Sequence, residues 1–218
     1  MVKIDRHSVP PSSLDVERQK AHGLYNMTDV IQQLRTDSHD KCYICELKGL
    51  SDPEVEHLRP HHDRKIVERV FDWNNLFYVC PHCNNLKKEE KYDDKIIDCC
   101  VDDPEEMLEQ CYEKGHVKIH NIINEECAIM TAELIQECFE KCNTGIREAA
   151  CKYRIDRLAE SMDVLYKTLE KYKKNPESER YMKSLKFALS RESAFAAFKR
   201  SYVRKHIGDY PDLKEFLV

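Results

Sequence analysis

Two pairs of cysteines have the spacing of metal-binding knuckles. Cys42 and Cys45 form one C-x-x-C pair, and Cys80 and Cys83 form the second. Each pair can hold one side of a tetrahedral zinc ion through its thiolates. Because four sulfur ligands leave no position open for water, we expect a structural Zn²⁺ rather than a catalytic one. The alternative is that these cysteines are only reactive or buried thiols.

The chain between the knuckles is longer than the roughly 15–20 residues common in a zinc ribbon, so it contains an inserted element. This insertion carries Glu56-His57 and, just before the second knuckle, Asn75, while Asn84 follows that knuckle directly. Phosphodiester hydrolysis needs a base that activates water and a cation near the phosphate oxygens. A neutral imidazole can act as the base near pH 7, and carboxylate and amide oxygens suit Mg²⁺.

The order of these residues resembles that of the HNH nucleases, also called His-Me finger or ββα-metal nucleases. The shared pattern is C-x-x-C, acid-His-x-x-Pro, then N-L-x-x-x-C-x-x-C-N-x-x-K, over residues 42–87. The resemblance implies that His57 is the general base and that Glu56 and Asn84 bind Mg²⁺ or another divalent cation. It also implies that Asn75 ties the loop to the backbone and orients His57.

The resemblance further implies that Lys87 and Arg59 contact the nucleic acid, DNA or RNA. This chain departs from the family in two respects. Glu56 stands where Asp or His is usual, and the glycine pair common before N-L is absent. Asn85 competes with Asn84 for the metal-binding position, and His61 and His62 have no assigned role.

The flanking segments are similar to those of the PtuB-type HNH nucleases of Septu and retron anti-phage systems. The similar parts are residues 98–104, a hairpin around Gly115, a helix ending near Arg147 and the stretch Ser193-Ala194-Phe195. Those nucleases act with an ATPase of the PtuA type. The resemblance therefore implies an ATPase partner, for which the helical half would be the docking surface.

Apolar spacing predicts the elements around the motif. A helix should end near Asp37, and the stripe from Ile155 to Tyr172 predicts a long helix. We expect an α+β, mainly helical fold: an N-terminal extended arm and helix (1–37), a zinc-braced ββα-metal HNH core (38–100), and a hairpin with a C-terminal helical region (101–218).

The formal net charge is −5, but charge is distributed unevenly along the chain. Residues 98–142 are strongly acidic and residues 180–206 strongly basic. This split predicts two faces of opposite sign, of which the basic one would meet phosphate. The alternative is an ordinary solvated helix surface.

Two other classes of function fit parts of the sequence. The first is a non-catalytic, zinc-dependent module that binds nucleic acid or protein, which would not need Glu56, His57 and Asn84 together. The second is a thiol redox sensor, because 7 of the 11 cysteines lie outside the knuckles. The absence of a signal peptide and of a long apolar run predicts a cytoplasmic protein without a membrane span.

Overall fold

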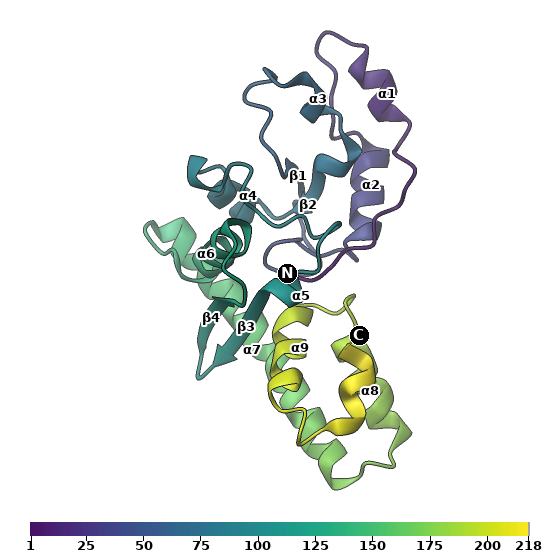
Figure 1. Ribbon diagram of the computed structural model, residues 1–218, viewed down its shortest axis with the longest axis vertical. Helices are drawn as coiled ribbons and strands as arrows, with labels where there is room; N and C mark the ends of the chain where they lie inside the picture. The colour runs from purple at the N-terminus through teal and green to yellow at the C-terminus, as the bar shows by residue number, and fades with distance from the viewer. Residues whose placement is uncertain (218) are drawn as a thin grey trace.

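The computed structural model describes residues 1–217 as an α+β fold, about half helical, with two small antiparallel sheets (Figure 1). The N-terminal half contains α1 (Ser13–Arg18), α2 (Thr28–Asp37), β1 (Glu54–His57), α3 (Val67–Val70), β2 (Leu76–Val79) and α4 (Pro81–Lys87). The C-terminal half contains α5 (Pro104–Met107), β3 (Leu108–Glu113), β4 (His116–Asn121), α6 (Glu126–Glu140), α7 (Gly145–Lys174), α8 (Glu179–Leu189) and α9 (Ala196–Lys205).

The insertion between the knuckles supplies two strands, and the helix that carries Cys83 of the second knuckle completes a ββα unit. Strand β1 pairs antiparallel with β2, so that Glu56 lies opposite Phe77 and His57 opposite Leu76. Helix α4 follows β2 after Cys80 and starts at Pro81, a residue well suited to the first turn of a helix. All four residues of β2 are buried, which means that both faces of this small sheet are covered.

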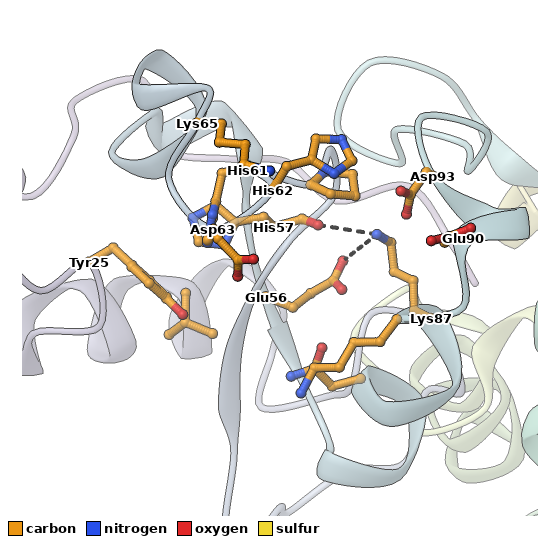
Figure 2. A pocket seen from close by; sticks show the side chains of 14 residues that line it. Tyr25, Glu56, His57, His61, His62, Asp63, Lys65, Lys87, Glu90 and Asp93 are labelled. Atoms are coloured by element: carbon orange, nitrogen blue, oxygen red, sulfur yellow. Dashed lines mark hydrogen bonds and ion pairs between the residues drawn. The ribbon is translucent and has the colours of Figure 1, made fainter.

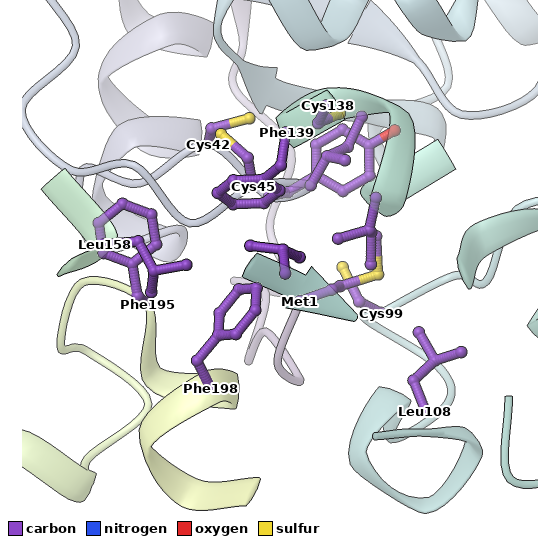
Figure 3. Packing of buried hydrophobic residues seen from close by; sticks show 14 of the residues in the cluster. Met1, Cys42, Cys45, Cys99, Leu108, Cys138, Phe139, Leu158, Phe195 and Phe198 are labelled. Carbon is purple, nitrogen blue, oxygen red and sulfur yellow. The ribbon is translucent and has the colours of Figure 1, made fainter. Parts of the chain in front are cut away.

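The two faces of the β1–β2 sheet pack into two different cores. Successive side chains of a strand point to opposite faces, so neighbouring residues of β2 enter different cores. Leu76 and Tyr78 pack with residues of α1, α2 and α3, whereas Phe77 and Val79 pack in the larger core. The larger core continues through all four knuckle cysteines to the helices of the C-terminal half. In Figure 3, Cys42 and Cys45 lie in one cluster with Phe139, Leu158 and Phe198. One continuous core thus crosses the boundary expected near residue 100.

Several predicted elements are present. Helix α2 ends at Asp37, and β3 and β4 form a hairpin in which Gly115 has φ +84°. The long helix extends over Gly145–Lys174, so the helix expected to end near Arg147 is instead the start of α7. The N-terminal segment is not extended throughout, because it includes the short helix α1.

The two segments of opposite charge do not form separate faces, so that expectation is wrong. Arg200 is almost fully buried and pairs with Glu105 at 2.7 Å. Arg191, Arg204 and Lys205 also form ion pairs with acids of the 98–142 segment. Packing α9 against β3 and α5 brings opposite charges together, which the linear charge distribution does not reveal.

Candidate functional site

The four knuckle cysteines come together in space. One sulfur atom from each of Cys42, Cys45, Cys80 and Cys83 lies within 4.8 Å of the other three, and all four side chains are buried. Four converging thiols are the donor set of a structural zinc centre, so this cluster could hold a metal ion such as zinc. Within residues 1–217, it is the only such group of three or more His, Cys, Asp or Glu.

A separate pocket of about 510 Å³ opens beside the ββα unit. Figure 2 shows the side chains of Glu56, His57 and Lys87 in its wall, from the end of β1 and from α4. The β1–α3 loop contributes His61, His62 and Lys65 to the lining, α4 contributes Asn84, and the segment after α4 contributes Lys88, Glu90 and Asp93, while Tyr25 comes from the loop before α2. Four of the residues implied by the HNH pattern, Glu56, His57, Asn84 and Lys87, therefore line one pocket.

The imidazole of His57 is held in one orientation. Its Nε2 lies 3.0 Å from the carbonyl oxygen of Val70, and its ring packs edge-on against the rings of Tyr25 and His61. Since a carbonyl oxygen only accepts, Nε2 carries the proton and Nδ1 has a free lone pair. Within residues 1–217, Nδ1 has no hydrogen-bond partner. Burial lowers the pKa of His57 to about 4, which keeps the ring neutral at pH 7.

Glu56 is a buried carboxylate with two partners. The Tyr43 hydroxyl donates a hydrogen bond to Oε1, and Lys87 Nζ lies 3.6 Å from the same oxygen. Burial raises the pKa of Glu56 although Lys87 and Tyr43 favour its charged form. The second oxygen, Oε2, has no partner among the described residues and is therefore available to a ligand in the pocket.

The ammonium group of Lys87 points into the protein interior, whereas a side chain that binds phosphate must be accessible to the ligand. It is 3% exposed, and its ammonium group donates to the carbonyl oxygens of His57 at 3.1 Å and Leu58 at 2.8 Å. Figure 2 shows the His57 carbonyl and the Glu56 carboxylate near this ammonium group, and the Leu58 carbonyl is the third acceptor around its three protons. Lys87 thus fixes the end of β1 rather than presenting a free charge to the pocket.

Asn84 lies on α4 and faces β1. Its amide nitrogen donates to Glu54 Oε2 at 2.5 Å, which turns the amide oxygen away from this contact. Glu54 and Glu56 lie on the same face of β1 because they are two residues apart. Asn85 is exposed and does not line the pocket, so the geometry favours Asn84 over Asn85.

Asn75 connects β2 to both ends of the β1–α3 loop. Its amide nitrogen donates to the carbonyls of Arg59 and Arg69 at 2.9 and 3.0 Å, and its amide oxygen accepts from Arg59 N at 2.7 Å. The loop that it closes contains His61 and His62 and leads to Val70, whose carbonyl holds His57. The Arg59 side chain is exposed and is not part of the pocket lining.

The rim of the pocket contains an unusual backbone turn. His62, Asp63 and Arg64 have φ values of 47°, 54° and 64°, three consecutive residues in the left-handed region. A residue other than glycine in this region costs of order 1–3 kcal/mol of conformational strain. Strain of this kind clusters at functional sites. The turn is held by hydrogen bonds from Lys65 N to His62 O and from Ile66 N to His61 O.

Sequence reasoning did not identify Tyr25, Tyr43 or Glu54, which contact His57, Glu56 and Asn84. A signal existed only for Glu54, since strand alternation places it beside Glu56. Tyr25 comes from the loop before α2 and Tyr43 from the first knuckle, so only the folded chain brings them to the pocket.

Comparison with models of known protein families found no match, and comparison with curated proteins found no similar sequence. Every helix within residues 1–217 is too short or too polar to cross a bilayer.

Proposed function

We propose that the protein is a metal-dependent HNH endonuclease that hydrolyses phosphodiester bonds in DNA or RNA. The observation that carries this proposal is His57, a neutral imidazole fixed through Nε2 with Nδ1 free, in a pocket that also contains Glu56 and Asn84. The antiparallel pair β1–β2 followed by α4 is the arrangement that the ββα-metal resemblance implies.

In this proposal His57 Nδ1 accepts the proton of the water that attacks phosphorus. The Val70 carbonyl keeps the ring in the required tautomer and stabilises the positive charge that the ring gains. Asn75 holds the loop that leads to Val70, and Lys87 fixes the backbone of His57. Both are positioning residues.

The side-chain oxygens of Glu56 and Asn84 are the ligands that would hold the divalent cation. A buried carboxylate and an amide oxygen match the hard donors that Mg²⁺ prefers, and Mg²⁺ commonly retains several waters beside one or two protein ligands. When bound, the cation supplies positive charge opposite the charge that develops on the phosphate. The exposed Lys65 and Lys88 at the pocket wall would contact neighbouring phosphates.

The direct test is cleavage by the purified chain. Single- and double-stranded DNA and RNA are incubated with zinc-loaded protein in the presence and absence of added Mg²⁺. We expect Mg²⁺-dependent cleavage of at least one substrate. Binding of nucleic acid without cleavage of any substrate, with or without the partner described next, would favour the non-catalytic binding module.

We further propose that the nuclease acts in an anti-phage system with an ATPase of the PtuA type. The support is the PtuB-type resemblance together with three exposed apolar side chains on α7. Ile146, Tyr153 and Val164 are 86%, 54% and 64% exposed, and their spacings of 7 and 11 residues place them on one side of the helix. Exposed apolar side chains of this kind commonly mark protein-binding surfaces.

Co-purification of the tagged chain with the neighbouring gene product tests the partner. Ile146→Asp and Tyr153→Asp should reduce recovery of the ATPase and leave isolated cleavage unchanged. Deletion of the last helices is unsuitable as a test, because Leu185, Leu189 and Phe198 lie in the main core. Lys183→Asp, which alters an exposed side chain of α8, is the control substitution.

A further inference from the structure

We propose that Arg154 is the counter-cation of the four-cysteine metal centre. Through Arg154 and Cys138, metal binding fastens α6 and α7 to the second knuckle. The inference rests on the cysteine cluster alone and does not depend on the proposed nuclease activity.

Arg154 occupies a core position of α7. The buried stripe of this helix includes Cys151, Leu158, Met162 and Leu165, and Arg154 lies between the first two at the same three- and four-residue spacing. Its side chain is only 4% exposed. A guanidinium group at such a position costs several kcal/mol of desolvation unless a negative charge lies against it. Core packing alone would be served better by an apolar residue.

The contacts of Arg154 identify the negative charge. Nη2 donates to Cys80 Sγ at 2.9 Å, Nη1 donates to the Ala150 carbonyl at 2.7 Å, and Nε is buried without a hydrogen-bond partner. Within residues 1–217, no Asp or Glu forms an ion pair with this guanidinium. The groups that can carry charge beside it are the knuckle thiols. A divalent ion compensates only two of four thiolates, so a loaded centre retains negative charge for Arg154 to balance.

Helix α6 makes a second contact with the same knuckle. Cys138 Sγ lies 3.3 Å from Cys83 Sγ, and the His82 ring donates from Nε2 to the Cys138 carbonyl at 3.1 Å. When Cys83 is a thiolate, the Cys138 thiol is the donor in the sulfur–sulfur contact. Cys138 lies in the same buried cluster as Cys42 and Cys45 (Figure 3). Both cysteines of the second knuckle therefore have an outer partner from the C-terminal half.

Outer partners of this kind hold metal ligands in place and balance their charge, and their loss typically lowers metal affinity about 10- to 100-fold. The competing explanation is that the Arg154 stem only fills space. Arg154→Met separates the two, because Met keeps an unbranched apolar side chain and removes the charge. If the Arg154 side chain only fills space, replacing its buried charge with an apolar side chain should leave the stability of the protein unchanged or raise it.

The first experiment compares zinc release from the full chain to a chromogenic chelator, under reducing conditions. The proteins are wild type, Arg154→Met, Arg154→Lys and the control Arg157→Met, which alters a half-exposed residue of the same helix. We expect Arg154→Met to weaken zinc retention about 10- to 100-fold, Arg154→Lys to retain more zinc than Met does, and the control to match wild type. Wild-type zinc retention by Arg154→Met would overturn the proposal.

The second experiment needs no variant and therefore decides the question if Arg154→Met does not fold. Amide hydrogen exchange of the wild-type chain is measured with zinc bound and at short times after a chelator is added. We expect residues 138–158 to lose protection earlier than α8, before the zinc-free chain unfolds as a whole. Unchanged protection at 138–158, or an equal loss in both regions, would show that the metal does not fasten these helices specifically.

Discussion

The Nε2 atom of His57 lies 3.0 Å from the carbonyl oxygen of Val70, thirteen residues further along the chain. This single contact determines the tautomer of the ring and leaves Nδ1 as its basic atom. Val70 is the last residue of α3, and the loop before α3 is closed by Asn75. The orientation of the proposed base thus depends on a loop that a second side chain holds in place.

Replacing His57 with Ala should abolish cleavage and leave the fold intact. Loss of a general base typically costs a factor of about 10² to 10⁴ in rate. Cleavage rates of the variant and of His116→Ala, which alters an exposed histidine on β4, are measured with Mg²⁺ at pH 8. The control should cut at the wild-type rate. Near wild-type cleavage by His57→Ala would remove this residue from the mechanism.

The His57 ring should lose its basic form only in strongly acidic solution. Burial lowers its pKa from 6.5 to about 4, so the ring stays neutral as the pH falls from 7 to 5 and gains a proton near pH 4. The unfolded chain gains that proton near 6.5, so stability declines as the pH falls between these values. NMR titration of the ring, assigned by comparison with His57→Ala, measures the pKa; a midpoint near 6.5 would contradict the prediction.

Asn75→Ala should destabilise the protein by about 2–3 kcal/mol, because it leaves Arg59 N and the carbonyls of Arg59 and Arg69 without their partner. Chemical denaturation measures this change. Cleavage should fall under conditions where the variant is still folded, since the loop before Val70 is released. The control is Asn74→Ala, which alters an exposed neighbour. Full activity in folded Asn75→Ala would show that the loop does not position His57.

Lys65 and Lys88 should contribute to nucleic-acid affinity through phosphate contacts. Changing both to Ala should weaken binding, and the slope of log K against log salt should become shallower by about one to two units. Fluorescence anisotropy at several salt concentrations measures both quantities. The Lys183→Ala control alters a lysine on α8 that is 80% exposed. An unchanged slope for the double variant would place the phosphates elsewhere.

Cys80→Ser should lose zinc and soluble protein together, because structural metal contributes directly to folding free energy. Metal analysis of the wild-type chain should find about one zinc per chain. The control is Cys127→Ser, which changes a half-buried cysteine of α6 outside the cluster. A wild-type chain without zinc and with normal stability would refute the prediction.

Local patterns predicted those parts of the structure that depend on local sequence. The end of α2 at Asp37, the hairpin at Gly115 and the buried stripe of α7 follow from apolar spacing and turn chemistry. Cysteine spacing likewise predicted that the two knuckles would converge on one centre. Each of these features depends on the spacing of residue types within one short segment or on the spacing of two cysteine pairs.

The contacts that complete the two sites could not be read from such patterns. Arg154 interrupts an apolar stripe, yet nothing in the sequence indicates that a cysteine of the second knuckle lies beside it. Lys87 was predicted to contact phosphate from its place in the motif, but burial against the His57 and Leu58 carbonyls gives it another role. Contacts between distant segments depend on how the helices pack, which the linear sequence does not specify directly.

The cysteine centre also has a consequence for synthesis of the chain. Arg154 lies 74 residues beyond Cys80, and Cys138 lies 55 residues beyond Cys83. At about 5–20 residues per second, a ribosome needs roughly 4–15 seconds to travel from Cys80 to Arg154. During this interval the nascent chain presents the knuckle thiols without their covering helices. Every round of translation therefore opens a brief period in which cellular oxidants and competing metal ions can reach the centre.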